Sequence, residues 1–193
     1  RSYHNNACMS IMTPEAVIIE SLFRIPNKDG TDVDFILNAE QKALDGALTN
    51  RNLVPKARQV GVSAYVLARY TAACMMRRNQ RAVVISHDQP STERMLKRVK
   101  YYVENLRGPA PVIENMSKNE ITFPKMNSMF YIGTAGAKAF GRGDTITHLH
   151  CSEYAYWPDP DKLMDGLTDA VPHNSGEIII ESTGKGMNDY AQR

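Results

Sequence analysis

Short apolar runs alternate with helix-like segments along most of this chain, and this order restricts the fold more than any other feature of the sequence. Four runs are expected to form strands: residues 53–54 begin a short strand, 82–85 are typical of a buried strand, and further strands are expected at 146–151 and 177–181. Parallel strands need a crossover between them, usually a helix, so this alternation favours a largely parallel sheet. The sequence therefore predicts an α/β fold in which helices flank a largely parallel sheet.

Capping patterns predict where the first two helices begin. Thr13 can cap a helix whose first residue is Pro14, and we expect this helix to run to about Arg24. Asn38 can cap a second helix, with Gln41 at the third helical position of a capping box. Further helices are expected at residues 63–78 and from residue 90 onward, and a hairpin at 120–123 and 130–132.

The length of the chain fits one domain. Its 193 residues match the common size of a single domain, and we expect residues 1–35 to be an N-terminal extension of the domain formed by residues 36–193. The net charge of +2 is too small to indicate nucleic-acid binding by itself. Basic clusters at 77–81 and 94–100 are, taken singly, more typical of solvated helix faces.

Cysteine usage and apolar segments indicate a reduced, non-membrane setting. The three cysteines show neither a CxxC pattern nor a Cys/His ligand spacing, so neither structural zinc nor a disulfide framework is expected. No segment reaches the ~18 apolar residues of a membrane span, and no signal-peptide pattern is present. We therefore expect a protein that is not secreted and has no membrane partner.

A basic loop follows the first expected strand. Residues 56–63 read KARQVGVS and lie where the ordinary phosphate loop, G-x-x-x-x-G-K-[ST], joins a strand to a helix. Gly61 and Ser63 occupy the last glycine and the hydroxyl positions, whereas Lys56 replaces the first glycine and Val62 the lysine. The positive charge has moved to the loop entrance, beside the helix N-terminus that also favours anions. An ordinary strand–turn–helix connection can have the same residues, so this motif alone does not identify a phosphate site.

An apolar strand with an acidic end is the second motif. Residues 146–153 read ITHLHCSE, which places the carboxylate of Glu153 where it can orient or deprotonate an attacking water. Nucleotide hydrolases commonly end this strand in Asp-Glu, and here Ser152 stands in the Asp position. Glu153 as a surface strand cap is the alternative. His148 and His150 share a strand face, but without further ligands they are more typical of ordinary core or surface residues than of a metal site.

A small hydroxyl-rich turn is the third motif. The strand at 177–181 ends in Glu181, and Ser182, Thr183 and Gly184 follow it. Such hydroxyls can contact a γ-phosphate and move when it leaves, although an ordinary strand-to-loop turn has the same composition. In an open α/β sheet, ligands bind beyond the carboxyl ends of the strands, so the three motifs together predict one site.

In this order, the motifs resemble the ATPase domain of bacteriophage large terminase subunits, over about residues 36–190. That family often has Lys or Arg early in its phosphate loop, as in 56–63, and many members have a Leu-His-x-Ser-Glu strand, which residues 149–153 match. The turn at 181–184 is similar to the family's coupling motif, and 83–87 to its second strand. The resemblance implies a phosphate-loop NTPase fold.

The resemblance also implies roles for individual residues. Four residues are implied at the triphosphate: Lys56, Arg58, Gly61 and Ser63. Gln59, Ser182 and Thr183 are also expected to bind the nucleotide. Glu153 is implied as the catalytic carboxylate, Thr183 in coupling hydrolysis to movement, and Ser63 as the Mg²⁺ ligand. Gln41 is placed like a glutamine that reads adenine, or it only completes the capping box. Arg142 resembles an arginine finger, acting within its own chain or on a neighbouring one.

Activity and partners follow from the same resemblance. The family uses ATP with Mg²⁺ to move double-stranded DNA into a procapsid in the host cytoplasm, with the capsid portal, a small terminase subunit and further copies of itself as partners. A C-terminal nuclease domain is not expected within these residues, nor is nuclease activity. Two alternatives remain open: a helicase-type ATPase, which generally has Asp-Glu where this chain has Ser152-Glu153, and a non-catalytic DNA-binding module with a decayed nucleotide site.

Overall fold

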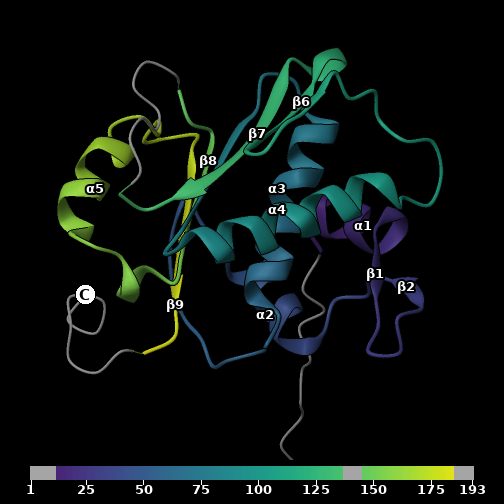
Figure 1. Ribbon diagram of the computed structural model, residues 1–193, viewed down its shortest axis with the longest axis horizontal. Helices are drawn as coiled ribbons and strands as arrows, with labels where there is room; N and C mark the ends of the chain where they lie inside the picture. Colours follow the sequence, from purple (N-terminus) through teal and green to yellow (C-terminus); the bar gives the residue numbers. More distant parts are fainter. Residues whose placement is uncertain (1–11, 137–144, 185–193) are drawn as a thin grey trace, which may run out of the picture.

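A central β-sheet organises the molecule (Figure 1), and the computed structural model describes residues 12–136 and 145–184. Within these residues the sheet has seven strands. In spatial order they are β3 (Arg51–Pro55), β9 (Glu177–Ser182), β8 (His148–Ser152), β4 (Arg81–Ser86), β7 (Ser128–Thr134), β6 (Glu120–Phe123) and β5 (Asn115–Met116).

The strand directions confirm the predicted sheet type. The pairs β3–β9, β9–β8, β8–β4 and β4–β7 are all parallel. The expected hairpin is present as the antiparallel pair β6–β7, and β5 adds a second antiparallel pair at that edge. The fold is α/β with a mostly parallel sheet.

Helices cover both faces of the sheet. They are α1 (Pro14–Leu22), α2 (Ala39–Ala47), α3 (Val62–Met76), α4 (Gln89–Glu104) and α5 (Pro160–Thr168), with short 3₁₀ helices η1 (Pro124–Met126) and η2 (Tyr154–Tyr156). Figure 1 shows α5 on one side of the sheet and α1, α3 and α4 on the other.

The described residues form two apolar cores, one on each face of the sheet, and alternate side chains of β4 belong to one or the other. On β4, Ala82 and Val84 belong to the core beneath α1, α3 and α4, whereas Val83 and Ile85 belong to the core beneath α5. Successive strand residues point to opposite faces of a sheet, so β4, which is apolar on both faces, must be covered on both. This explains why the run at 82–85 shows no alternation of polar and apolar residues.

The N-terminal helix ends earlier than predicted. It ends at Leu22 instead of Arg24, because Arg24 pairs with Asp34 in a small antiparallel hairpin of β1 (Arg24–Pro26) and β2 (Asp32–Asp34). The hairpin and α5 had no predicted counterpart. The capping box of α2 is confirmed, with Asn38 and Gln41 bonding reciprocally.

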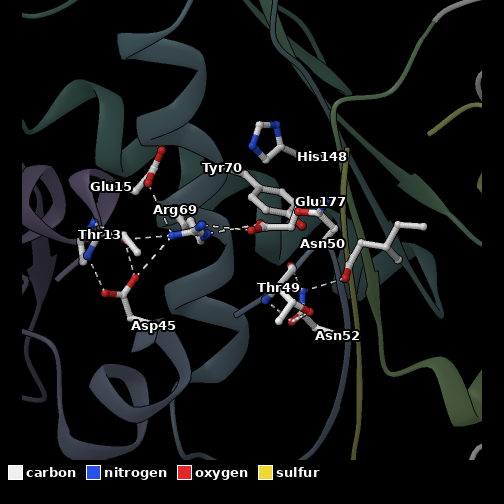
Figure 2. Close-up of polar contacts among 12 residues, drawn as sticks. Thr13, Glu15, Asp45, Thr49, Asn50, Asn52, Arg69, Tyr70, His148 and Glu177 are labelled. Atoms are coloured by element: carbon white, nitrogen blue, oxygen red, sulfur yellow. Dashed lines mark hydrogen bonds and ion pairs between the residues drawn. The ribbon is translucent and has the colours of Figure 1, made fainter. Parts of the chain in front are cut away.

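A partly buried ionic network joins the helical layer to the sheet. Figure 2 shows Arg69 of α3 between carboxylates from three other segments. Its Nη2 lies 3.0 Å from Glu177 Oε2 on β9, and its Nη1 lies 3.4 Å from Asp45 Oδ1 on α2 and 3.6 Å from Glu15 Oε2 on α1. Thr13, the N-cap of α1, also donates its hydroxyl to Asp45, at 2.5 Å. This network aligns α3, whose N-terminus lies at the candidate site.

Candidate active site

Four parallel strands end side by side at one edge of the sheet. Lys56 follows β3, Thr183 follows β9, Glu153 follows β8 and His87 follows β4. In the register of the sheet, Pro55 pairs with Ser182 and Ser152 with Glu181, so the ends of three strands are level. The three motifs, which are far apart in the sequence, therefore meet at the carboxyl edge, where open α/β sheets bind ligands.

The loop between β3 and α3 has the backbone of a tight turn. Gly61 caps α3 with φ of 81°, and Gln59 has φ of 63°. A Cβ at position 61 would lie 2.7 Å from Gln41 Nε2. Glycine is therefore required both for the left-handed backbone and for the close approach of Gln41. Because no side chain caps α3, its first N–H groups remain available to an anion.

Lys56 lies between two carboxylates. Its Nζ is 2.7 Å from Glu153 Oε1 and 3.0 Å from Glu181 Oε2, and its side chain is only 9% exposed. The backbone N–H of Lys56 donates to the carbonyl of Ser182, which fixes the loop entrance to β9. A cation so placed can reach a phosphate bound at the same edge.

Glu153 is held in a left-handed backbone conformation, with φ of 52°. Its Oε2 accepts hydrogen bonds from the backbone N and from Oγ1 of Thr183, each at 3.1 Å. Burial raises the pKa of Glu153, but the hydrogen bonds from Lys56 and Thr183 outweigh burial and leave the pKa below its ordinary value. The carboxylate is ionised at neutral pH, as a residue that accepts a proton must be.

Glu181 is a site residue to which the sequence assigned no role. Its side chain is fully buried, and its Oε1 accepts hydrogen bonds from Ser63 Oγ at 2.9 Å and Ser152 Oγ at 2.6 Å. His150 Nε2 lies 3.3 Å from the same oxygen. The sequence did contain a signal for this role. Glu181 comes directly after the apolar run at 178–180, and a charged residue at such a position needs buried partners.

An open hollow of about 490 Å³ lies over this edge. Its walls include Lys56, Arg58, Gln59, Ser63, Glu153 and Thr183, which were all predicted as site residues, and also Arg94 and Arg98 of α4. The two arginines belong to a basic cluster that the sequence favoured as a solvated face. Local composition does not show whether a helix face is turned toward a cavity, because this depends on tertiary packing.

A second hollow of about 480 Å³ adjoins the first, since Arg98 lines both. Gln41 and Gly61 form one side, and the aromatic rings of Phe35, Tyr101 and Tyr102 contribute to the walls. The side-chain amide of Gln41 completes the capping box and also donates from Nε2 to the carbonyl of Gly61, at 2.9 Å. Gln41 therefore links the cap of α2 to the loop before α3.

The two histidines of β8 are buried core residues. Burial, reinforced by Arg69 and Arg77, lowers the pKa of His148 to about 3, and burial with Lys56 lowers that of His150 to about 3. Both rings are neutral at physiological pH. Among the described residues, no three His, Cys, Asp or Glu side chains form a cluster that could hold a metal ion. Arg142 lies outside the described residues.

The described residues form an α/β fold with a mostly parallel sheet, a glycine-capped loop before α3 and a glutamate directly after β8. The fold is that of phage large terminase ATPase domains. The chain superposes on the large terminase of bacteriophage HK97 with a TM-score of 0.71 at 14% identity, over 87% of this chain and 36% of that one. For the ATPase domain of the Thermus phage P74-26 large terminase, the TM-score is 0.62 at 19% identity, over 80% of this chain and 68% of that one.

An arginine-to-alanine variant of the P74-26 domain gives a TM-score of 0.61 at 18% identity, with the same coverage. The chain thus spans 36% of the length of the HK97 protein. No protein-family model and no curated protein matches the sequence. In the described part of the chain, no helix has the length and apolar character needed to cross a membrane.

Proposed function

We propose that this domain binds ATP with Mg²⁺ and hydrolyses it, as the motor domain of a viral large terminase that moves double-stranded DNA into a procapsid. The observation that carries the proposal is the meeting of Lys56, Ser63 and Glu153 at one sheet edge, with Lys56 Nζ 2.7 Å from Glu153 Oε1. A cation, a hydroxyl at a helix N-terminus and an ionised carboxylate are the groups that phosphoryl transfer to water requires.

The loop and α3 bind the triphosphate in this proposal. Lys56 and Arg58 neutralise phosphate oxygens, and Gln59 contributes from the same wall of the hollow. Behind Gly61, the uncapped N–H groups of α3 donate to the phosphates, and the helix dipole favours their charge. Lys56 then exchanges one of its carboxylate partners for a phosphate, which releases Glu153 toward water.

Glu153 is the general base that orients and deprotonates the attacking water. Thr183 holds one of its oxygens through two hydrogen bonds, and Ser182 Oγ lies 3.5 Å from that oxygen. When the contacts of Glu153 change on hydrolysis, these hydrogen bonds transmit the change to the turn after β9. We assign to Ser182 and Thr183 the coupling of hydrolysis to movement.

The donor groups at this edge fit Mg²⁺. This ion keeps several waters and phosphate oxygens as ligands and takes few from the protein, so a site without a cluster of acidic ligands is suitable. Ser63 would supply the protein ligand, and a bound ion would supply positive charge to the phosphates.

Gln41 and the second hollow are assigned to the base. The aromatic walls suit the faces of a purine, and the amide of Gln41 borders the same space. The hydrogen bonds of its amide to the N–H of Asn38 and the carbonyl of Gly61 use one lone pair of Oε1 and one hydrogen of Nε2, so a second lone pair and a second hydrogen remain for adenine. We expect the wild-type chain to bind ATP at least about tenfold more tightly than GTP, and Gln41→Ala to lose this difference. Measuring both affinities in both chains tests this role.

Arg142 is proposed as the arginine that completes the site, supplied by a neighbouring copy of the chain. The remaining partners are double-stranded DNA, the capsid portal and a small terminase subunit, in the host cytoplasm and at the procapsid. Mixing Glu153→Gln chains with Arg142→Ala chains should restore part of the ATPase activity, because some interfaces pair an intact Glu153 with an intact Arg142. If the mixture stays inactive, Arg142 does not act between chains.

The central test is Mg²⁺-dependent ATP hydrolysis with and without double-stranded DNA. Glu153→Gln should lower kcat by about 10²–10⁴ and leave ATP affinity nearly unchanged, since a general base acts mainly in the transition state. Glu120→Gln, a glutamate of β6 that lies outside the hollow, is the matched control. An inactive wild type that still binds DNA supports the non-catalytic alternative, and strand separation driven by ATP supports the helicase-type one.

A further inference from the structure

Strand β8, which Glu153 follows, lacks the acidic residue that ordinarily precedes the catalytic glutamate. In phosphate-loop hydrolases, a strand-end aspartate and the loop hydroxyl together hold Mg²⁺. In this chain the corresponding residue is Ser152, a neutral side chain that is fully buried. The hydroxyl of Ser63 therefore has no carboxylate partner from β8.

A carboxylate from the next strand occupies that place. Ser152 pairs with Glu181 across β8 and β9, and Ser152 Oγ donates to Glu181 Oε1 at 2.6 Å. The same oxygen accepts from Ser63 Oγ at 2.9 Å. Ser152, which stands in the aspartate position, therefore holds the carboxylate of Glu181 by a hydrogen bond. Glu181 in turn holds the hydroxyl of Ser63, which an aspartate would ordinarily hold.

We propose that Glu181 of β9 replaces the missing strand-end aspartate by orienting the hydroxyl of Ser63 for Mg²⁺. A hydroxyl that ligates a cation must direct its proton away from the cation. Glu181 accepts the hydrogen bond from the hydroxyl of Ser63, which leaves the oxygen lone pairs of Ser63 for the ion. The inference rests on the proposed ATP-binding function. Glu181 acts through Ser63 and is therefore a positioning residue.

A purely structural role for Glu181 makes a different prediction. The buried carboxylate also lies 3.0 Å from Lys56 Nζ, so its removal would disturb Lys56 and affect nucleotide binding equally with and without Mg²⁺. Orientation of Ser63 affects only the part of the affinity that depends on the metal. The ratio of nucleotide affinities with and without Mg²⁺ therefore separates the two roles.

The experiment measures equilibrium binding of a fluorescent ATP analogue in saturating Mg²⁺ and in EDTA. Glu181→Gln should reduce the gain in affinity on adding Mg²⁺ by at least about tenfold, the usual effect of losing a group that orients a metal ligand. Binding in EDTA should be unchanged or tighter, because one negative charge near the triphosphate is lost. Adding Glu181→Gln to Ser63→Ala should cause no further loss, because Glu181 acts through Ser63.

Glu177→Gln is the matched control, since it makes the same substitution on the same strand in another ion pair, the partly buried one with Arg69. It should lower the thermal stability and leave the Mg²⁺ gain at the wild-type value. If Glu181→Gln fails to fold, Glu181→Asp keeps the charge, withdraws the oxygen from Ser63 and should also reduce the gain.

If Glu181→Gln keeps the wild-type gain in nucleotide affinity on adding Mg²⁺, or loses affinity equally with and without Mg²⁺, the role of Glu181 is overturned. The ATPase proposal remains intact in both cases. A wild-type chain that binds no analogue under either condition overturns the ATPase proposal, and the inference with it. The two failures are therefore distinguishable in one set of titrations.

Discussion

Lys56 is the residue on which most contacts of the candidate site converge. Its ammonium group lies within 3.0 Å of two carboxylates, those of Glu153 directly after β8 and Glu181 of β9, and its backbone is hydrogen-bonded to β9. In an ordinary phosphate loop, the lysine projects from the start of the helix. Here it projects from the end of β3 and reaches the same edge of the sheet from the opposite end of the loop.

Replacing Lys56 should therefore weaken nucleotide binding. We expect Lys56→Ala to lower ATP affinity or turnover by at least about tenfold, which corresponds to ~1.4 kcal/mol of lost phosphate stabilisation. Val62→Ala is the control, because it changes the residue at the usual lysine position without removing a charge. Equal and small effects of both substitutions in titrations with ATP would contradict the displaced-lysine hypothesis.

At the scale of elements, α4 contributes two cations to the hollow. Arg94 donates to Ser91 Oγ at 2.7 Å, and Arg98 lies where the two hollows adjoin. We expect Arg98→Ala to weaken ATP binding by about tenfold, in the range of a lost charge-assisted hydrogen bond, and to affect adenosine less. Lys100→Ala removes the same charge from α4 outside both hollows and should leave binding unchanged. Equal affinities of the two variants for ATP would remove α4 from the site.

The buried strand β8 should make stability depend on pH. The pKa of both His148 and His150 is about 3 in the folded chain, against ~6.5 for an unfolded histidine. Between these values the unfolded state binds protons that the folded state does not. Stability is therefore complete above about pH 6.5 and falls as the pH decreases, by up to ~1.4 kcal/mol per pH unit for each histidine.

Urea unfolding at about pH 7.5 and 5.5 measures this effect, because ordinary carboxyl groups titrate mostly below this range. His148→Gln should reduce the difference between the two pH values by about half, since one of two equivalent contributions is lost. A free energy of unfolding that is the same at both pH values would show that the two rings do not remain neutral in the folded chain.

At the scale of the whole molecule, the network around Arg69 holds four elements together (Figure 2). Its ion pairs join α3 to α1, α2 and β9, and Arg69 is only 11% exposed at its side chain. Removal of one partner of a buried ion pair leaves uncompensated charges. We therefore expect Arg69→Met to lower the free energy of unfolding by about 3–5 kcal/mol.

Arg107→Met is the matched control for this prediction. Arg107 pairs with Asp34 at 2.8 Å, but their side chains are 55% and 42% exposed, so the loss should stay below about 1 kcal/mol. Urea unfolding of both variants makes the comparison. Similar losses would mean that the network around Arg69 adds no more stability than an exposed pair.

Local chemistry in the sequence determined several features of the fold. The capping box of Asn38 and Gln41 and the strand at 82–85 could be predicted because each depends on neighbours within a few residues. The hairpin of β6 and β7 depends on similarly short-range pairing. By contrast, α5 was missed, and the helix before Arg24 was predicted too long, because the pairing of Arg24 with Asp34 ends it.

The candidate site shows the same division. Lys56, Ser63 and Glu153 were predicted because each stands at a strand end or helix start that the sequence marks. Glu181 was assigned no role, since its partners Ser63 and Ser152 lie 118 and 29 residues away along the chain. The sequence alone determined which polar groups end each strand. Only the tertiary structure decided which of them share one buried carboxylate, because strand order in a parallel sheet brings together residues that have no local interaction.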